Sequence, residues 1–101
     1  IECRFVKKDD IMISPAYNRT AAYIAVHQFK GMPYEAYFKK SEAIFKKYNG
    51  RPHWGKINYL SESDFSALYL KWKEFKEIQK MQDPNGLFLN DYLDKLFTND
   101  P

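Results

Sequence analysis

The stretch Ala21-Ala22-Tyr23-Ile24-Ala25-Val26-His27-Gln28-Phe29 decides how the rest of the chain is interpreted. It is rich in aromatic and β-branched residues, and apolar side chains occur at both odd and even positions. This pattern predicts a strand over residues 21–29 that is covered on both faces, as in the centre of a sheet. Side chains at alternate positions share a face, so Tyr23, Ala25, His27 and Phe29 would point the same way.

Elements of both kinds flank this strand. Residues 1–6 form a second strand-like segment, and a short apolar run at 11–13 stops at Ser14-Pro15. After residues 31–33, apolar side chains recur at helical spacing as far as a stop at Asn49-Gly50. Residues 51–59 lack helical periodicity and are predicted to be a loop.

The last third of the chain predicts helices. Ser61-Glu62-Ser63-Asp64 is a typical helix start, and a second long helix should follow, with an apolar stripe reaching residue 81. Asp83-Pro84-Asn85-Gly86 should end that helix, and Asn90-Asp91 should cap a short terminal one. The predicted class is therefore α+β: short antiparallel strands, two long helices and a short terminal helix.

Length and composition set limits on the kind of protein. The 101 residues amount to one domain or a piece of a larger one, and a chain that opens directly on a strand is expected to be cut from something longer. The net charge of +3 comes from 16 basic and 13 acidic residues that are mixed along the chain. No basic arm or dense Lys/Arg block is present, so nucleic acid is not an expected partner.

Several chemistries are disfavoured by the residues available. The lone Cys3 allows no internal disulfide and fits a reducing, cytoplasmic compartment. One cysteine and two histidines offer no metal-ligand spacing, so no metal site is predicted. There is also no Gly-rich phosphate loop, no Ser-centred nucleophile elbow and no apolar run of membrane-spanning length.

The loop Arg51-Pro52-His53-Trp54-Gly55-Lys56 is one candidate site. In a structural interpretation, Trp54 anchors the loop in the core and His53 is a hydrogen-bonded partner. In a functional one, Lys56 follows a glycine in a rigid aromatic loop, where its ammonium could stabilise charge on an electron-accepting cofactor. The residues alone leave both interpretations open.

Two further candidates lie on the predicted strands. Glu2 and Arg4 share a strand face, which places an acceptor beside a planar donor. The sequence alone favours an ordinary exposed ion pair here, although in a pocket the two side chains would bind adjacent sugar hydroxyls. For His27, in the middle of an apolar strand, a hydrogen-bonded core histidine is favoured over a catalyst.

Four motifs in order resemble one family over residues 1 to about 98. They are Ile1-Glu2-Cys3-Arg4-Phe5-Val6, Asp9-Asp10-Ile11-Met12-Ile13-Ser14-Pro15, Gly50-Arg51-Pro52-His53-Trp54-Gly55-Lys56, and Asp83-Pro84-Asn85-Gly86-Leu87-Phe88-Leu89-Asn90 with Tyr92-Leu93. Together they look like the aldonolactone oxidases, which include L-gulonolactone, arabinonolactone and alditol oxidases among the vanillyl-alcohol-oxidase-type flavoproteins. The resemblance implies a two-domain enzyme whose N-terminal domain, absent here, binds FAD. That domain would be the partner of this chain, which the resemblance places as the C-terminal part of the cap (substrate) domain.

The resemblance also implies roles for individual residues. Glu2 would bind substrate hydroxyls, and Arg4 would steady the carbinol or lactone oxygen as a hydride leaves its carbon. Lys56 would lie beside the flavin near N5, where its charge favours reduced flavin and could assist proton removal. His53 and Trp54 would shape that cofactor-facing loop, and His27 falls on a strand where some relatives carry a substrate-contacting histidine.

The expected activity is thus FAD-dependent oxidation of sugar-1,4-lactones or alditols, with oxygen as the expected acceptor, and no turnover by this part alone. The rival interpretation is a non-catalytic interaction domain that uses its aromatic helices against a partner protein. In that rival, Glu2, Arg4 and Lys56 should lie apart and exposed. A nucleic-acid module is a third and weaker alternative, and homo-oligomer formation stays open.

Overall fold

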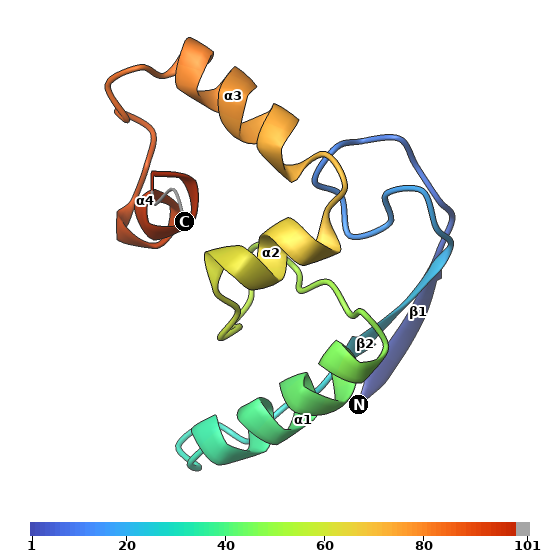
Figure 1. Cartoon of the computed structure of the whole chain (residues 1–101). Helices are drawn as coiled ribbons and strands as arrows, with labels where there is room; N and C mark the ends of the chain where they lie inside the picture. Colours follow the sequence, from blue (N-terminus) through green and yellow to red (C-terminus); the bar gives the residue numbers. More distant parts are fainter. Residues whose placement is uncertain (99–101) are drawn as a thin grey trace. The chain divides into compact units, whose positions relative to one another are not determined.

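The computed structural model describes residues 1–98 and divides the chain into two compact units, Ile1–Tyr59 and Leu60–Pro101. Residues 1–98 contain two strands and four helices, which confirms the predicted α+β class (Figure 1). Among these residues, none of the helices is both long enough and apolar enough to cross a membrane.

The first unit opens with a two-stranded antiparallel sheet. Strand β1 spans Glu2–Val6 and pairs with β2, Ala21–Ala25. Glu2 lies opposite Ala25, and Arg4 lies opposite Tyr23. The prediction of a strand over 21–29 is wrong at its C-terminal end, because β2 stops at Ala25. The prediction that both faces of this strand are covered is also wrong, because Ile24 is 47% exposed. The described residues supply one pairing strand and no layer over Ile24, so the apolar pattern is not matched by burial within this chain.

The connection between the two strands is a closed loop built around Asp9. Its carboxylate accepts hydrogen bonds from the Ser14 hydroxyl at 2.6 Å and from the Ile11 N–H at 3.1 Å. Its carbonyl accepts the Asn18 N–H at 2.8 Å, and Asp9 forms an isolated parallel bridge with Tyr17. These bonds order the segment and enclose Ala16, which is completely buried.

Helix α1, Glu35–Lys47, ends where the sequence predicts. Asn49 has a left-handed φ of 53°, and the Gly50 N–H reaches back to the Phe45 carbonyl at 2.8 Å. This is the Schellman pattern, which satisfies carbonyls at the end of a helix. Within the described part of the chain α1 buries none of its residues completely, so its aromatic face stays largely at the surface.

The second unit contains α2 (Glu62–Leu68), α3 (Trp72–Gln82) and α4 (Asp91–Phe97). The predicted helix starts are confirmed: Ser61 and Asp64 form a reciprocal capping box, and the Asn90 side chain accepts the Leu93 N–H at 2.9 Å. The turn after α3 is also confirmed, since the buried Asp83 carboxylate accepts the N–H groups of Leu87 and Phe88.

The second long helix was predicted as one element, and that prediction is wrong. Tyr69 has an extended backbone (φ −115°, ψ 108°), which separates α2 from α3. The break lets the Trp72 ring contact Phe65 at 5.5 Å between centroids and Phe97 of α4 at 5.4 Å. Phe65, Tyr69 and Trp72 are all buried, so packing of large rings outweighs the continuous helical stripe.

Candidate functional site

The loop 51–56 is held against the closed loop of residues 9–18. The Trp54 indole N–H donates to the Ile13 carbonyl at 2.8 Å, and the Arg51 guanidinium donates to the carbonyls of Tyr17 at 2.8 Å and Pro15 at 3.3 Å. The structural interpretation of Trp54 is therefore supported, because its indole fixes the loop to a segment far away in sequence. Arg51, which the sequence did not single out by itself, anchors the same loop.

The far end of this loop is a tight turn that presents Lys56. His53 accepts the Gly55 N–H at its ring Nδ1, 3.0 Å away, and its carbonyl accepts the Lys56 N–H at 3.0 Å. The side chains of His53 and Lys56 are exposed. The Lys56 ammonium is therefore carried by a turn whose backbone is fixed by hydrogen bonds, and it is accessible to a ligand.

Glu2 and Arg4 form an ion pair through Arg4 Nε and Glu2 Oε1 on one face of β1. Their side chains are 46% and 76% exposed respectively, so within this chain they are the surface pair that the sequence favours. Such a pair contributes about 0–1 kcal/mol to folding. Both groups therefore keep most of their hydrogen-bonding capacity for a ligand.

His27 does not lie in a core. It follows the end of β2 and is exposed, so the interpretation as a hydrogen-bonded core histidine is wrong for this chain. The strand stops two residues before it, and no layer of the described residues covers this position. His27 remains accessible to a ligand.

Register places two other residues next to the Glu2–Arg4 pair. Ala25 lies directly opposite Glu2, and Tyr23 lies directly opposite Arg4. Burial raises the pKa of the Tyr23 phenol above its ordinary value, the nearby Asp9 carboxylate raises this pKa further, and the Arg51 guanidinium lowers it in part. The alternation of residues 21–29 indicated which of these side chains share a face of the strand. Only the register of β1 and β2 showed which residues of β1 lie opposite them.

The structure thus brings the candidates together as two groups within the first unit. Glu2 and Arg4 form one group, and His53, Trp54 and Lys56 form the other. Among residues 1–98, no hydrogen bond or ion pair joins Lys56 to Glu2 or Arg4.

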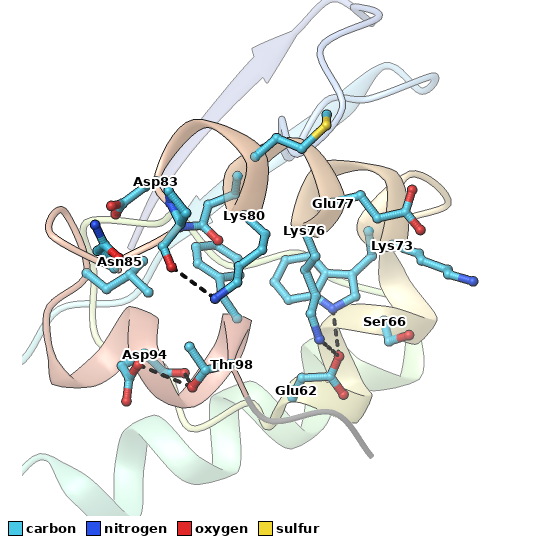
Figure 2. Close-up of a pocket in the computed structure, with 17 residues that line it drawn as sticks. Glu62, Ser66, Lys73, Lys76, Glu77, Lys80, Asp83, Asn85, Asp94 and Thr98 are labelled. Atoms are coloured by element: carbon cyan, nitrogen blue, oxygen red, sulfur yellow. Dashed lines mark hydrogen bonds and ion pairs between the residues drawn. The ribbon is translucent and has the colours of Figure 1, made fainter.

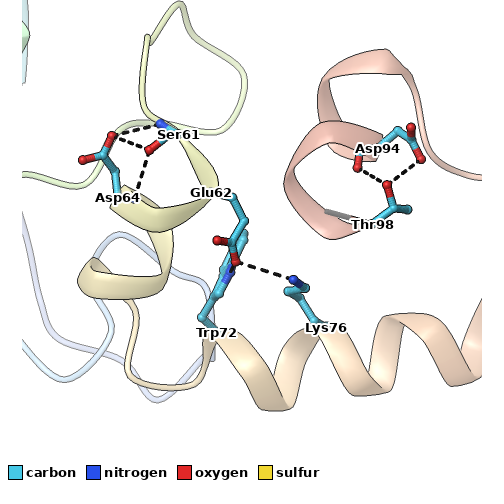
Figure 3. A network of polar contacts seen from close by, with 7 residues as sticks. All are labelled: Ser61, Glu62, Asp64, Trp72, Lys76, Asp94 and Thr98. Carbon is cyan, nitrogen blue, oxygen red and sulfur yellow. Dashed lines mark hydrogen bonds and ion pairs between the residues drawn. The ribbon is translucent and has the colours of Figure 1, made fainter. Parts of the chain in front are cut away.

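The second unit has a groove of its own, between α3, the turn after it and α4 (Figure 2). Two of its lysines have local partners: Lys76 approaches Glu62 at 3.5 Å, and Lys80 donates to the Pro84 carbonyl at 3.1 Å. The Trp72 indole N–H shares the same Glu62 oxygen at 2.8 Å (Figure 3). None of the predicted site residues lines this groove. Its lining residues come from α2, α3, the turn after α3 and α4.

Comparison with known proteins shows which family the chain belongs to. The model of the family described as D-arabinono-1,4-lactone oxidase matches residues 1–96.

The chain belongs to this family.

Individual members are similar over most of the chain. It is 46% identical to L-gulono-1,4-lactone dehydrogenase of Mycobacterium tuberculosis, over 91% of the chain and 22% of that protein. It is 41% identical to L-gulonolactone oxidase of Scyliorhinus torazame, over 96% of the chain and 23% of that protein. Alditol oxidase of a Streptomyces species is 29% identical over 91% of the chain and 22% of its own length. The chain thus spans 22–23% of the length of these relatives, and it matches them across both of its units.

Proposed function

We propose that this member of the D-arabinono-1,4-lactone oxidase family is the substrate- and flavin-facing part of an FAD-dependent oxidase of sugar-1,4-lactones or alditols. The observation that carries the proposal is the family match over residues 1–96, because it includes the segments of Glu2, Arg4 and Lys56. The same match favours an enzyme over a non-catalytic interaction domain. The relatives are named as oxidases and as a dehydrogenase, all acting on sugar lactones or alditols.

The residues present fit a limited role toward FAD. Lys56 stands exposed on a loop that Trp54 and Arg51 hold, so its ammonium can face a flavin whose phosphates and adenine another domain binds. When bound, FAD would accept the hydride that leaves the carbinol carbon of the substrate. Lys56 would favour this transfer by placing positive charge where negative charge develops. The same positive charge would make the substrate hydroxyl more acidic and so assist loss of its proton to water, while His53 and Trp54 keep the loop in one conformation.

On the strand, the Glu2–Arg4 pair would bind the sugar. The Glu2 carboxylate accepts hydrogen bonds from substrate hydroxyls, and the Arg4 guanidinium donates to the carbinol or lactone oxygen. Because the pair is already formed, each side chain is oriented by the other before the ligand arrives. His27, exposed just beyond β2, would add a contact at the edge of this surface.

The partner would be the FAD-binding domain of the same enzyme. One face of the β1–β2 ribbon carries Phe5, which is 82% exposed, and Ile24, while Glu2 and Arg4 occupy the other face. A two-stranded sheet is only marginally stable in water unless another layer packs on it. We therefore expect the FAD-binding domain to cover the apolar face. We expect no turnover from residues 1–101 alone, and full activity only after they are joined to an FAD-binding portion.

The test joins residues 1–101 to an FAD-binding portion, which we call the assembled oxidase. Anaerobic mixing with sugar-1,4-lactones and alditols should bleach the visible absorbance of the flavin. Lys56→Ala should slow this reduction by roughly 10²-fold or more, as expected when a group that stabilises developing charge is removed. Lys40→Ala, which alters an exposed lysine of α1, is the matched control and should leave the rate unchanged. The proposal fails if no lactone or alditol reduces the flavin, or if Lys56→Ala behaves like the control.

A further inference from the structure

Helix α1 holds the segment that follows Lys56. The Glu42 carboxylate accepts the Tyr59 backbone N–H at 2.8 Å through its Oε2 atom. The Lys39 ammonium lies over the Tyr59 ring, 5.2 Å from the ring centroid. Lys39 and Glu42 are three positions apart on α1 and are therefore neighbours on the helix surface. The backbone of Tyr59 is thus bound by a charge-assisted hydrogen bond, and its ring by a cation–π contact, to the same helix.

The start of the same loop is closed on the same helix. The Gly50 N–H bonds to the Phe45 carbonyl at 2.8 Å, immediately before Arg51. Phe45 follows Glu42 by three residues, which is about 4.5 Å along the helix axis. The two points at which residues 51–59 are attached to α1 therefore lie within about one helical turn of each other. Close ends of this kind are typical of an Ω-loop.

Lys56 lies close to the attachment at Tyr59. Three residues separate the two, so their Cα atoms cannot be more than about 11 Å apart. Between them, the Asn58 side-chain amide donates to the Lys56 carbonyl at 3.4 Å. Trp54 fixes the loop before Lys56, and Glu42 fixes it after Lys56. The backbone that carries the ammonium is thus restrained on both sides.

We propose that Glu42 is a positioning residue for Lys56: its carboxylate closes the loop of residues 51–59 on α1 and so fixes where the ammonium stands. In a purely local role, Glu42 would satisfy the Tyr59 N–H and Lys56 would keep its place without it. The inference rests on the proposed function for its catalytic consequence. Glu42 is not among the residues to which the family resemblance gives a role.

The first test needs no substrate and measures amide hydrogen exchange in the assembled oxidase. Glu42→Ala removes the acceptor and keeps a good helix former, so α1 should stay folded. The Tyr59 amide should exchange roughly tenfold faster or more. The Lys56 amide, which bonds to the His53 carbonyl, should exchange roughly three- to tenfold faster.

Two variants serve as controls for the exchange measurement. Glu42→Gln keeps a side-chain oxygen for the Tyr59 N–H, so both amides should exchange nearly as in the wild type. Lys40→Ala, at an exposed lysine of α1, should change neither amide. If Glu42→Ala accelerates exchange at Tyr59 alone, or at neither amide, the proposal is overturned.

The second test is a double-mutant cycle in the assembled oxidase. Glu42→Ala alone should lower the rate constant of flavin reduction roughly three- to tenfold, and Glu42→Gln should restore it. In a Lys56→Ala background, Glu42→Ala should have no further effect, because Glu42 acts through the position of Lys56. The same fold-change in both backgrounds overturns the proposal. If no sugar lactone or alditol reduces the wild-type flavin, the proposed function has failed, while the exchange measurement still decides whether Glu42 positions the loop.

Discussion

Trp54 donates its indole N–H to the carbonyl oxygen of Ile13 at 2.8 Å, across 41 residues of chain. This bond joins the loop that carries Lys56 to the closed loop between the strands. It also explains why an aromatic residue stands in the middle of that loop: the ring is long enough to reach, and its single donor finds a backbone acceptor. Through Trp54 and Arg51, the position of a proposed functional cation depends on residues 13–17.

Loss of the Trp54 bond should therefore loosen the whole first unit. Trp54→Phe keeps an aromatic ring but leaves the half-buried Ile13 carbonyl without this donor. We expect a loss of about 1–3 kcal/mol in the free energy of unfolding, measured by denaturant titration. Phe29→Leu, at an exposed ring of the same unit, serves as control and should change the midpoint little. An unchanged midpoint in Trp54→Phe would show that the bond contributes nothing.

Two glycines of the same region should respond differently to alanine. A Cβ on Gly50 would lie 2.9 Å from both the Cβ and the carbonyl oxygen of Phe45, closer than atoms tolerate, so the end of α1 must shift. A Cβ on Gly55 would meet only the His53 ring, at 3.4 Å and 3.5 Å, which is ordinary contact. We expect Gly50→Ala to cost about 1–3 kcal/mol and Gly55→Ala less than about 0.5 kcal/mol. Thermal unfolding of both variants checks the difference, and equal melting temperatures would contradict it.

In the second unit, Glu62 links α2 to α3 through Trp72 and Lys76 (Figure 3). The side chains of Glu62 and Lys76 are only 15% and 14% exposed, so the acceptor cannot be replaced freely by water. Glu62→Ala should cost about 1–3 kcal/mol, and Glu62→Gln, which keeps an oxygen for the indole, should cost less.

Glu74 offers the matched comparison, because its ion pair with Lys71 is 46% exposed on the acid side. Glu74→Ala should change the free energy of unfolding by no more than about 0.5 kcal/mol. Denaturant unfolding of the three variants would rank them, and a Glu74→Ala loss as large as that of Glu62→Ala would refute the distinction.

The Glu2–Arg4 pair should matter for substrate and not for folding. Because both side chains are well exposed, Arg4→Ala should shift the unfolding midpoint very little. In the assembled oxidase the same change should lower kcat/KM for lactone or alditol by roughly 10²-fold, since a charged donor to a reacting oxygen is lost. Lys71→Ala removes the basic partner of another exposed pair and should leave kcat/KM unchanged. A large stability loss in Arg4→Ala, with kcat/KM unchanged, would remove Arg4 from the proposed site.

Local signals in the sequence were sufficient to predict where several helices begin or end. The capping box of Ser61 and Asp64, the Asn90 cap and the Asn49-Gly50 stop all use hydrogen bonds between residues a few positions apart. Such bonds join residues that are close in sequence, so residue type and spacing predict them. The family resemblance was also readable from sequence, because it rests on the order of four motifs along residues 1–98.

Non-local packing decided what the sequence could not. The apolar stripe over residues 65–81 predicts one helix, yet Tyr69 breaks it because Trp72 must meet both Phe65 and Phe97. That choice depends on a ring of α4, far along the chain, which helical periodicity does not encode.

The loop that carries Lys56 also combines features that the sequence predicted with features that only the folded structure revealed. From sequence alone, residues 51–56 were predicted to be a rigid aromatic loop, with its lysine, tryptophan and histidine as candidate site residues. Tertiary structure alone decided that Trp54 bonds to Ile13, that Arg51 anchors the loop and that Tyr23 stands beside Arg4. The physical reason is that strand register and long-range hydrogen bonds join residues tens of positions apart, and their geometry exists only once the chain has folded.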